Sequence, residues 1–482
     1  MTRRTLLVSL LVLVLAAAQV LGQGCPPPSN IPVGSCAPNA GTATNFAGDP
    51  GAMRVRKSIY TLTSTELAEL RLAFQKLRAL PSTDPRTWMA QAKVHCWYCA
   101  GDNSSVADVH GTWAFMPWHR DYLYVLEKIL GKLVNNPNFA IPYWDWNTPD
   151  TPQCTGHLRV PPPYLGSTNN SLFDCYRVVT PASTMSNSSV GAARVTQILN
   201  GANTFPLFFG SPTVSAALWP GPHGYVHLFV GNSVNPSSAK QDMGVLETAA
   251  RDPLFWAHHA NIDRLWDVWV AKYGTPVYPT GFLNQNWTFW NQDQKLMRFT
   301  GGDAANRATR LKYRYAPPCG EAPVQAAPAP PAKPPEIVSM TPQPQTFRTE
   351  AKATGRTFKI GPNSGTHVVV NLENVTAPAD EAAILRVFVN RPQANAGMAE
   401  DSHLVQELFI VPGRTPGTGH AGHQHSFNFK IVLPEAIAAE VEKAKGNVPV
   451  TIVPVAATPK GVLSVAPKQV RVKMAKPYIT VE

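Results

Sequence analysis

The chain has 482 residues, 44% of them hydrophobic and 15% charged, which is enough for about three domains of ordinary size. Its 42 Lys and Arg residues outnumber 31 Asp and Glu residues, and the formal net charge is +11. No basic run and no alternation of basic and aromatic residues is present, so the charge indicates a solvated basic surface and excludes a nucleic-acid-binding protein.

The first 23 residues predict a secretory signal peptide. Arg3 and Arg4 precede an apolar run from Leu6 to Val20. A twin-arginine signal is the alternative, because the arginine pair partly fits that pattern. No later stretch is long and apolar enough to span a bilayer. We therefore expect a secreted or vacuolar protein, in preference to the plastid lumen, with no membrane attachment after the signal is cleaved.

Five Asn-x-Ser/Thr sequons fit passage through an oxidising, glycosylating compartment. Because sequons also arise by chance, we expect about half of them to be used. The candidate glycosylation sites are Asn103, Asn169, Asn187, Asn286 and Asn374.

Two blocks of histidines dominate the middle of the chain. The first block contains His95, His110 and His119, and the second contains His223, His227 and His259. A single histidine on a helix is usually an ordinary core or surface residue, so the prediction depends on the arrangement. His223 and His227 are four residues apart, which places them on one face of a helix.

His119 and His259 lie on the apolar faces of two further predicted helices. Residues 115–130 carry apolar side chains at helical spacing, and Asp252-Pro253 predicts the start of the helix that contains His259. Buried imidazoles need a partner, and helical bundles commonly build metal sites from facing helices. Six neutral imidazoles without a carboxylate or thiolate suit a pair of late first-row metal ions.

Four motifs make the chain resemble the plant polyphenol oxidases, in the tyrosinase and hemocyanin group of type 3 binuclear copper proteins. They lie within residues 50–318 and are MPWHRDYLYVLE, PYWDW at 142–146, HHANIDRLW and Tyr313-Arg314-Tyr315. The resemblance implies that the first copper (CuA) is bound by His95, His110 and His119. It implies that the second (CuB) is bound by His223, His227 and His259, while a swap between His258 and His259 stays open.

The same resemblance implies oxidation of o-diphenols to o-quinones with dioxygen as co-substrate. The fold would be α+β: a mainly helical catalytic domain over 24–318, in which a four-helix bundle holds both coppers, followed by a β-sandwich. Asp145, Asp263 and Arg264 are expected to hydrogen-bond the ligand imidazoles and set their tautomer. By resemblance, Arg56 would contact the segment Tyr313–Tyr315.

The chain has seven cysteines, so one lacks a disulfide partner. In the plant enzymes the second cysteine of the HCxYC motif forms a thioether with the second ligand histidine. The resemblance therefore implies a thioether between Cys99 and His110, which would fix a ligand carried on a loop. A zinc site at Cys96 and Cys99 is disfavoured, because no second CxxC motif follows.

Six cysteines remain for three disulfides. Cys154 and Cys175 are the expected local pair, since no other cysteine falls between them. For the other four we favour the pairs Cys36–Cys96 and Cys25–Cys319.

Three positions depart from many plant relatives in ways that bear on the substrate. Trp219 replaces a glutamate thought to hold the water that deprotonates monophenols. Gly224 replaces an asparagine that often assists this water, and Leu246 replaces a phenylalanine that gates the second copper. The resemblance, with these departures, favours diphenol oxidation over monophenol hydroxylation.

The last third of the chain changes character. Residues 319–345 are rich in Pro and Ala and predict an extended, protease-sensitive linker. In residues 346–482, alternating hydrophobic segments predict an antiparallel sandwich with strands at 367–375, 383–391, 404–411, 427–433, 448–456 and 470–475. By resemblance, this domain shields the copper site until an activating protease removes it.

Two further hypotheses concern the metal. His420, His423 and His425 could capture copper, although an ordinary His-rich hairpin loop is favoured. A hemocyanin-like oxygen carrier, a tyrosinase that also hydroxylates monophenols and a structural zinc protein are the alternatives to a catechol oxidase.

Overall fold

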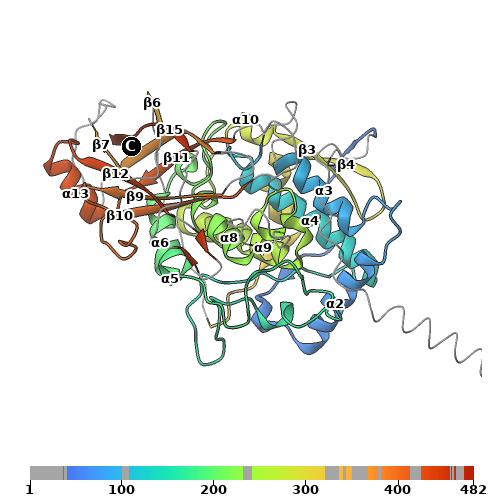
Figure 1. Cartoon of the computed structure of the whole chain (residues 1–482). Helices are drawn as coiled ribbons and strands as arrows, with labels where there is room; N and C mark the ends of the chain where they lie inside the picture. Colours follow the sequence, from blue (N-terminus) through green and yellow to red (C-terminus); the bar gives the residue numbers. More distant parts are fainter. Residues whose placement is uncertain are drawn as a thin grey trace, which may run out of the picture.

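The structure is a computed structural model, shown in Figure 1. It describes residues 36, 41–99, 108–231, 242–320, 336–339, 344–349, 367–377, 382–412, 425–455, 457–458, 461–462 and 472–481. Helices fill the first two thirds of the chain and strands fill the last third, so the predicted α+β class is confirmed.

Four longer helices, two of them central, form the helical part. They are α2 (Ser64–Arg78), α3 (Trp88–Cys99), α4 (Phe115–Val134) and α9 (Pro253–Tyr273). Helix α4 is buried on all sides over most of its length, because apolar residues occupy nearly its whole circumference. Helix α9 begins as predicted: the backbone N–H of Leu254 donates to Oδ1 of Asp252 at 2.7 Å, and proline fills the first position.

Shorter helical segments surround the central helices α4 and α9. They are η2 (Ile59–Thr61), η3 (Pro162–Tyr164), α5 (Asn187–Val190), α6 (Ala192–Gly201), α7 (Phe205–Phe208), η4 (Trp219–His223), α8 (Gly224–Gly231), η5 (Asp242–Gly244), η6 (Ala249–Arg251), α10 (Thr280–Leu283), α11 (Gly301–Ala305) and α12 (Arg307–Arg310). A small sheet pairs β1 (Thr44–Asn45), β4 (Leu296–Thr300) and β3 (Asn286–Trp290).

The helical part is closed by a parallel pair, β2 (Arg54–Arg56) with β5 (Tyr313–Tyr315). Arg56 is fully buried and donates to Glu127 at 2.7 Å, to Asp263 at 3.2 Å and to the hydroxyl of Tyr315 at 3.0 Å. The expected contact of Arg56 with Tyr313–Tyr315 is therefore present. It joins the start and the end of the helical part through a buried ion network.

Two antiparallel sheets make up the C-terminal part, as predicted. In the first the order is β10 (Leu404–Ile410), β9 (Ala383–Val389), β12 (Pro449–Val455), β7 (Gln345–Arg348). In the second it is β11 (His425–Val432), β8 (Val368–Ala377), β15 (Lys473–Lys476), β6 (Glu336–Ser339), with β16 (Tyr478–Val481) also on β8. The sequence did not predict α13 (Glu435–Lys443), β13 (Ala457–Thr458) or β14 (Gly461–Val462), and it also missed β6, β7 and β16. Strand β6 lies inside the segment predicted as linker.

The two parts share one continuous hydrophobic core. Strand β10 contacts η4 and α8, and Figure 1 shows the C-terminal strands beside the green helices α6 and α8. Both β10 and β11 are edge strands of their sheets. The helical part therefore covers a sheet edge that would otherwise present unpaired backbone groups.

The disulfides partly correct the predicted pairing. Cys36–Cys96 is present, with a Cα–Cα distance of 5.7 Å. Cys154 pairs with Cys319, not with Cys175, and their Cα atoms are 6.0 Å apart. The reason is the path of the chain after β5, where the N–H of Cys319 reaches Asp145 in the segment before Cys154. The expected pairs Cys154–Cys175 and Cys25–Cys319 are therefore wrong. Cys175 is also disulfide-bonded.

Several predictions fall on residues outside the described part. These are the signal peptide at 1–23, Cys25, the sequon at Asn103, residues 321–335 of the linker, and His420 and His423. Among the helices that are described, none combines the length and hydropathy needed to cross a membrane.

Candidate metal centre

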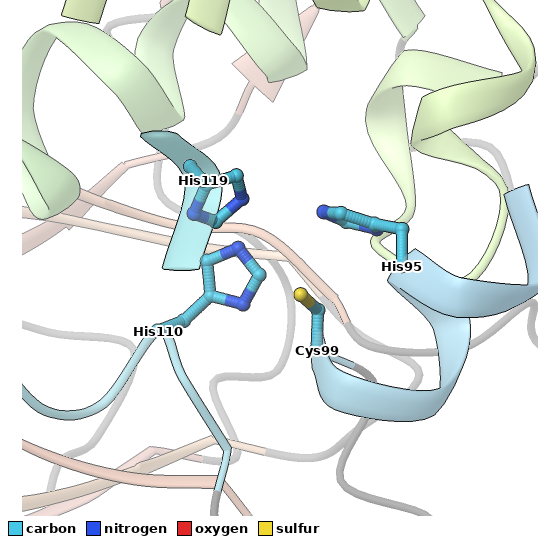
Figure 2. Close-up of side chains that lie close together, drawn as sticks. All are labelled: His95, Cys99, His110 and His119. Carbon is cyan, nitrogen blue, oxygen red and sulfur yellow. The ribbon is translucent and has the colours of Figure 1, made fainter. Parts of the chain in front are cut away.

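Two helices and one turn bring the first block of histidines together. His95 lies on α3, His119 on α4 and His110 in the turn before α4. Together with Cys99 they form a cluster in which one donor atom of each residue lies within 4.8 Å of all the others. Figure 2 shows the rings of the three histidines converging, with the sulfur of Cys99 directed into the space between them. All four side chains are buried.

The second block forms a similar cluster on η4, α8 and α9. It contains His223, His227, His258 and His259, again within 4.8 Å of one another and buried. The backbone is kinked at Gly221, inside η4, and His223 and His227 follow this kink one turn apart. The structure thus brings together each of the two predicted trios.

The two clusters face each other. The rings of His119 and His259 are stacked, with centroids 4.3 Å apart and planes at 9°. Phe255 lies against both sites, with its ring centroid 4.1 Å from that of His259 and 4.9 Å from that of His95. The arrangement is a pair of histidine sites in one buried aromatic space.

Backbone carbonyls fix the tautomer of four of these histidines. The ring atom Nδ1 of each lies near one carbonyl oxygen: His95 to Leu246 at 2.7 Å, His119 to Phe115 at 2.8 Å, His223 to Trp219 at 3.2 Å and His227 to Met243 at 2.7 Å. A carbonyl only accepts, so Nδ1 must carry the proton and donate. The lone pair of each ring is therefore on Nε2, which points into the centre.

These Nε2 atoms fit a metal ion. Those of His95, His110, His119 and His223 are buried and have no hydrogen-bond partner, and that of His227 lies 3.2 Å from Nε2 of His259. Buried acceptors without a donor are costly, and a cation held by several imidazoles removes the cost. Burial also lowers the pKa of His227 to about 3, which keeps the ring neutral and able to bind a metal.

His258 differs from its neighbours. The indole N–H of Trp146 donates to its Nδ1 at 3.1 Å. An indole nitrogen is only a donor, so Nδ1 of His258 is the acceptor and the ring proton lies on Nε2. Neither nitrogen then offers a free lone pair to the centre. The geometry favours His259 over His258 as the third member of the second trio.

The carboxylates expected to orient the imidazoles do not do so. Asp263 binds Arg56, Arg120 and the hydroxyl of Tyr313. Asp145 accepts from Ser58 at 2.9 Å. Backbone carbonyls take the orienting role, and sequence motifs carry no signal for them.

Arg264 binds asparagines in place of a predicted ligand imidazole. Its guanidinium donates to Asn261 at 2.9 Å and to Asn147 at 3.0 Å. Its expected role beside the metal is therefore wrong, because α9 turns this side chain toward the asparagines.

Cys99 is the free cysteine among the described residues, and it is buried. It lies in the cluster with His110, whose Nδ1 is 3.3 Å from Oδ1 of Asp108. His110 is on a turn, as expected, and lacks the backbone anchor that holds the helical histidines. The predicted thioether partners are thus close together.

The three predicted substrate-tuning residues all lie near the centre. Trp219 is fully buried, with its ring centroid 6.2 Å from that of His110 and 6.5 Å from that of His223. Gly224 follows His223 directly. Leu246 is fully buried and presents its carbonyl to His95.

Comparison with known proteins bears on this geometry. The family model "Common central domain of tyrosinase" matches residues 85–172 and 167–272, which include all six predicted ligands. Aureusidin synthase of Antirrhinum majus is 29% identical over 83% of this chain and 72% of its own length. The latent chloroplastic polyphenol oxidase of Prunus armeniaca is 34% identical over 61% of this chain and 54% of its own length.

The chain spans about half the length of most of these curated polyphenol oxidases, for example 53% of the one from Vitis vinifera. Among solved structures, latent aurone synthase (polyphenol oxidase) superposes with a TM-score of 0.72 over 93% of both chains, at 22% identity. This likeness covers the helical part and the C-terminal sheets together and concerns the fold.

These relatives correct the expected location. The polyphenol oxidases of Prunus armeniaca, Vitis vinifera, Malus domestica and Ipomoea batatas are described as chloroplastic, so the prediction of a secreted or vacuolar protein is wrong. More than one translocation system recognises an arginine pair before an apolar run. The pattern therefore did not identify which membrane the protein crosses. Glycosylation, which depended on the secretory route, stays a prediction for the exposed Asn169, Asn187 and Asn286 and the half-buried Asn374.

Proposed function

We propose that this chain, whose central part matches the tyrosinase family model and which has relatives among plant polyphenol oxidases, is a copper-dependent oxidase that converts o-diphenols to o-quinones with dioxygen. The polyphenol oxidase relatives support an oxidoreductase. We propose the substrate, the activation by cleavage and the roles of single residues.

One observation carries it: two buried histidine clusters face each other, and the Nε2 atoms of His95, His110, His119 and His223 have no protein donor. We assign CuA to His95, His110 and His119, and CuB to His223, His227 and His259. Two copper ions at these positions supply the electron transfer between the phenol and dioxygen.

The chain's own residues prepare this centre. The carbonyls of Leu246, Phe115, Trp219 and Met243 hold imidazoles with the proton on Nδ1, so that no ring has to turn when a metal binds. Phe255 and Phe115 exclude water from both sites. A thioether from Cys99 would give His110 the fixed orientation that its turn does not provide.

Diphenols are favoured over monophenols because positions 219 and 224, which serve a proton-accepting water in many relatives, carry no base here. A monophenol must lose its proton before it binds a metal, and neither histidine cluster includes a carboxylate. Trp219 and Gly224 lack any side-chain group that accepts a proton. A catechol loses its first proton more readily than a monophenol and therefore depends less on a nearby base.

We further propose that the enzyme acts in the plastid and is made in a latent form. The domains would be a catalytic unit at 24–318, a cleavable linker at 319–345 and a shielding unit at 346–482. The contacts of β10 with η4 and α8 support shielding, because they cover the segment that carries His223 and His227.

Metal content and oxidation of 4-methylcatechol, measured before and after limited proteolysis with removal of the C-terminal part, test the proposal. About two coppers per chain, with oxidation appearing once the C-terminal part has been removed, is the expected result. Two coppers with no oxidation in either state would point instead to oxygen carriage. Hydroxylation of tyramine as fast as oxidation of the matching catechol would identify a tyrosinase.

A further inference from the structure

All three substrate-tuning positions of the helical part contact the C-terminal sheets. Trp219 contacts β11 and Gly224 contacts β10. Leu246 contacts Pro412, just after the end of β10. We propose that these positions form a docking seat for β10 and β11, with Trp219 as its anchor. Residues that would tune the substrate in relatives would then hold the C-terminal part in place in this chain.

Trp219 makes the largest contact of the seat. Its ring lies 4.5 Å from that of Phe427 and is stacked on that of Phe429, with centroids 5.9 Å apart and planes at 10°. Phe427 also covers Gly111, where an added Cβ would be 3.4 Å from its ring. The same tryptophan lies between these two rings and the imidazoles of His110 and His223. An aromatic side chain at position 219 therefore binds the sheet, which a glutamate could not do without burying a charge.

Gly224 has a steric role. A Cβ at this position would lie 2.3 Å from the carbonyl oxygen of Phe409 and 2.9 Å from its Cβ. At Gly221, three residues earlier, an added Cβ would lie 3.1 Å from Nε2 of the Gln406 side chain. The backbone of β10 can lie this close to the segment that carries His223 only because Gly224 has no side chain.

Leu246 completes the seat through its backbone. Its N–H donates to the carbonyl of Pro412 at 2.8 Å, and its own carbonyl accepts from Nδ1 of His95. Pro412 of the C-terminal part is thus connected to His95, a predicted CuA ligand, through Leu246 alone. Release of the sheets removes the hydrogen bond on one side of Leu246 and frees the segment that orients His95.

Polar contacts surround the seat. The hydroxyl of Ser189 donates to Glu407 at 2.8 Å, and the N–H of Ser215 donates to the carbonyl of Asn428 at 3.0 Å. An apolar centre inside a polar rim is the usual build of a stable protein interface. We therefore expect the C-terminal part to stay bound after the linker is cut. Its effect on substrate entry rests on the proposed function, but its docking does not.

The test uses the full chain with a specific protease sequence inserted in the segment 321–335. After the cut, size-exclusion chromatography shows whether the two fragments elute together. Wild type should elute as one species. Phe427→Ala and Phe429→Ala leave the helical part unaltered and should raise the dissociation constant of the fragments about tenfold or more. Phe347→Ala, on the edge of the first sheet opposite to β10, is the matched control and should not change it.

A second set of variants tests the contact of Trp219 by changing the helical part instead of the C-terminal sheets. Trp219→Ala should weaken retention as Phe427→Ala does, and the double variant should add little, because both remove the same contact. Trp290→Ala, at the end of β3, controls for the loss of a large side chain. Copper content is measured in parallel. Fragments that separate in wild type, or that stay together equally in the Phe427, Phe429 and Trp219 variants, would overturn the proposal, whether or not the protein oxidises catechols.

Discussion

The indole N–H of Trp146 donates to Nδ1 of His258 at 3.1 Å, and this bond distinguishes two adjacent histidines. His258 keeps its proton on Nε2, whereas His259 directs Nε2 toward Nε2 of His227 at 3.2 Å. We predict that His259→Gln lowers the copper content from about two per chain to about one, while His258→Gln leaves it near two. Atomic absorption on purified protein measures both. The reverse pattern would move the ligand to position 258.

A covalent link between Cys99 and His110 is the second prediction. Its formation removes one hydrogen atom from each side chain, with dioxygen as the electron acceptor. Mass spectrometry of a proteolytic digest should find the two peptides joined and lighter by two hydrogen atoms. Cys99→Ser should give separate peptides, with copper content near that of wild type. Detection of a free thiol at Cys99 in the copper-loaded protein would contradict the link.

Asp174 makes stability depend on pH. Burial, with the negative charge of Asp252 nearby, raises its pKa to about 6. The folded state then holds a proton that the unfolded state releases near pH 4, so stability falls as the pH rises from about 4 to about 6. The difference between these pKa values corresponds to about 3 kcal/mol.

We therefore expect Asp174→Asn to raise Tm at pH 7 and to flatten its dependence on pH between 4 and 6. The amide oxygen can still accept from the N–H of Tyr176, which lies 2.7 Å from Oδ1. Asp293→Asn, at an exposed site, is the control. Equal Tm values of Asp174→Asn and wild type at pH 7 would show that the buried Asp174 carboxylate does not destabilise the fold at that pH.

Leu246 offers a test of the gate. Its backbone contacts do not depend on the side chain, so Leu246→Phe should keep His95 in place and leave copper content unchanged. The larger ring narrows the approach to the second site, and we expect KM for 4-methylcatechol to rise about tenfold with a smaller change in kcat. Steady-state kinetics on linker-cut protein from which the C-terminal part has been removed measures this. A KM equal to that of wild type would mean that the side chain does not border the substrate path.

Much of this molecule was predictable from local pattern. The helix from Pro253 follows from its cap and its apolar spacing, and the strands β8 to β12 follow from alternation. The histidine trios were predictable from motifs. Contacts between segments distant in sequence were not. Cys154 meets Cys319, 165 residues later, because β5 returns beside β2.

The orienting partners of the imidazoles also could not be predicted. Every residue has a carbonyl, so nothing in the identity of Met243 or Leu246 indicates that its oxygen faces a histidine. Trp219 shows the same limit in another form. The sequence identified it as a change near the metal, and only the fold shows that its other face touches β11.

The placement of β10 and β11 at sheet edges has a consequence for the fate of the C-terminal part once it leaves. Each strand would then present a row of free N–H and C=O groups, together with the exposed rings of Phe427 and Phe429. Such edges pair with any strand available, including another copy. The released fragment should therefore be short-lived in solution, lost to self-association or degradation, and the separation of the two parts would be irreversible in practice.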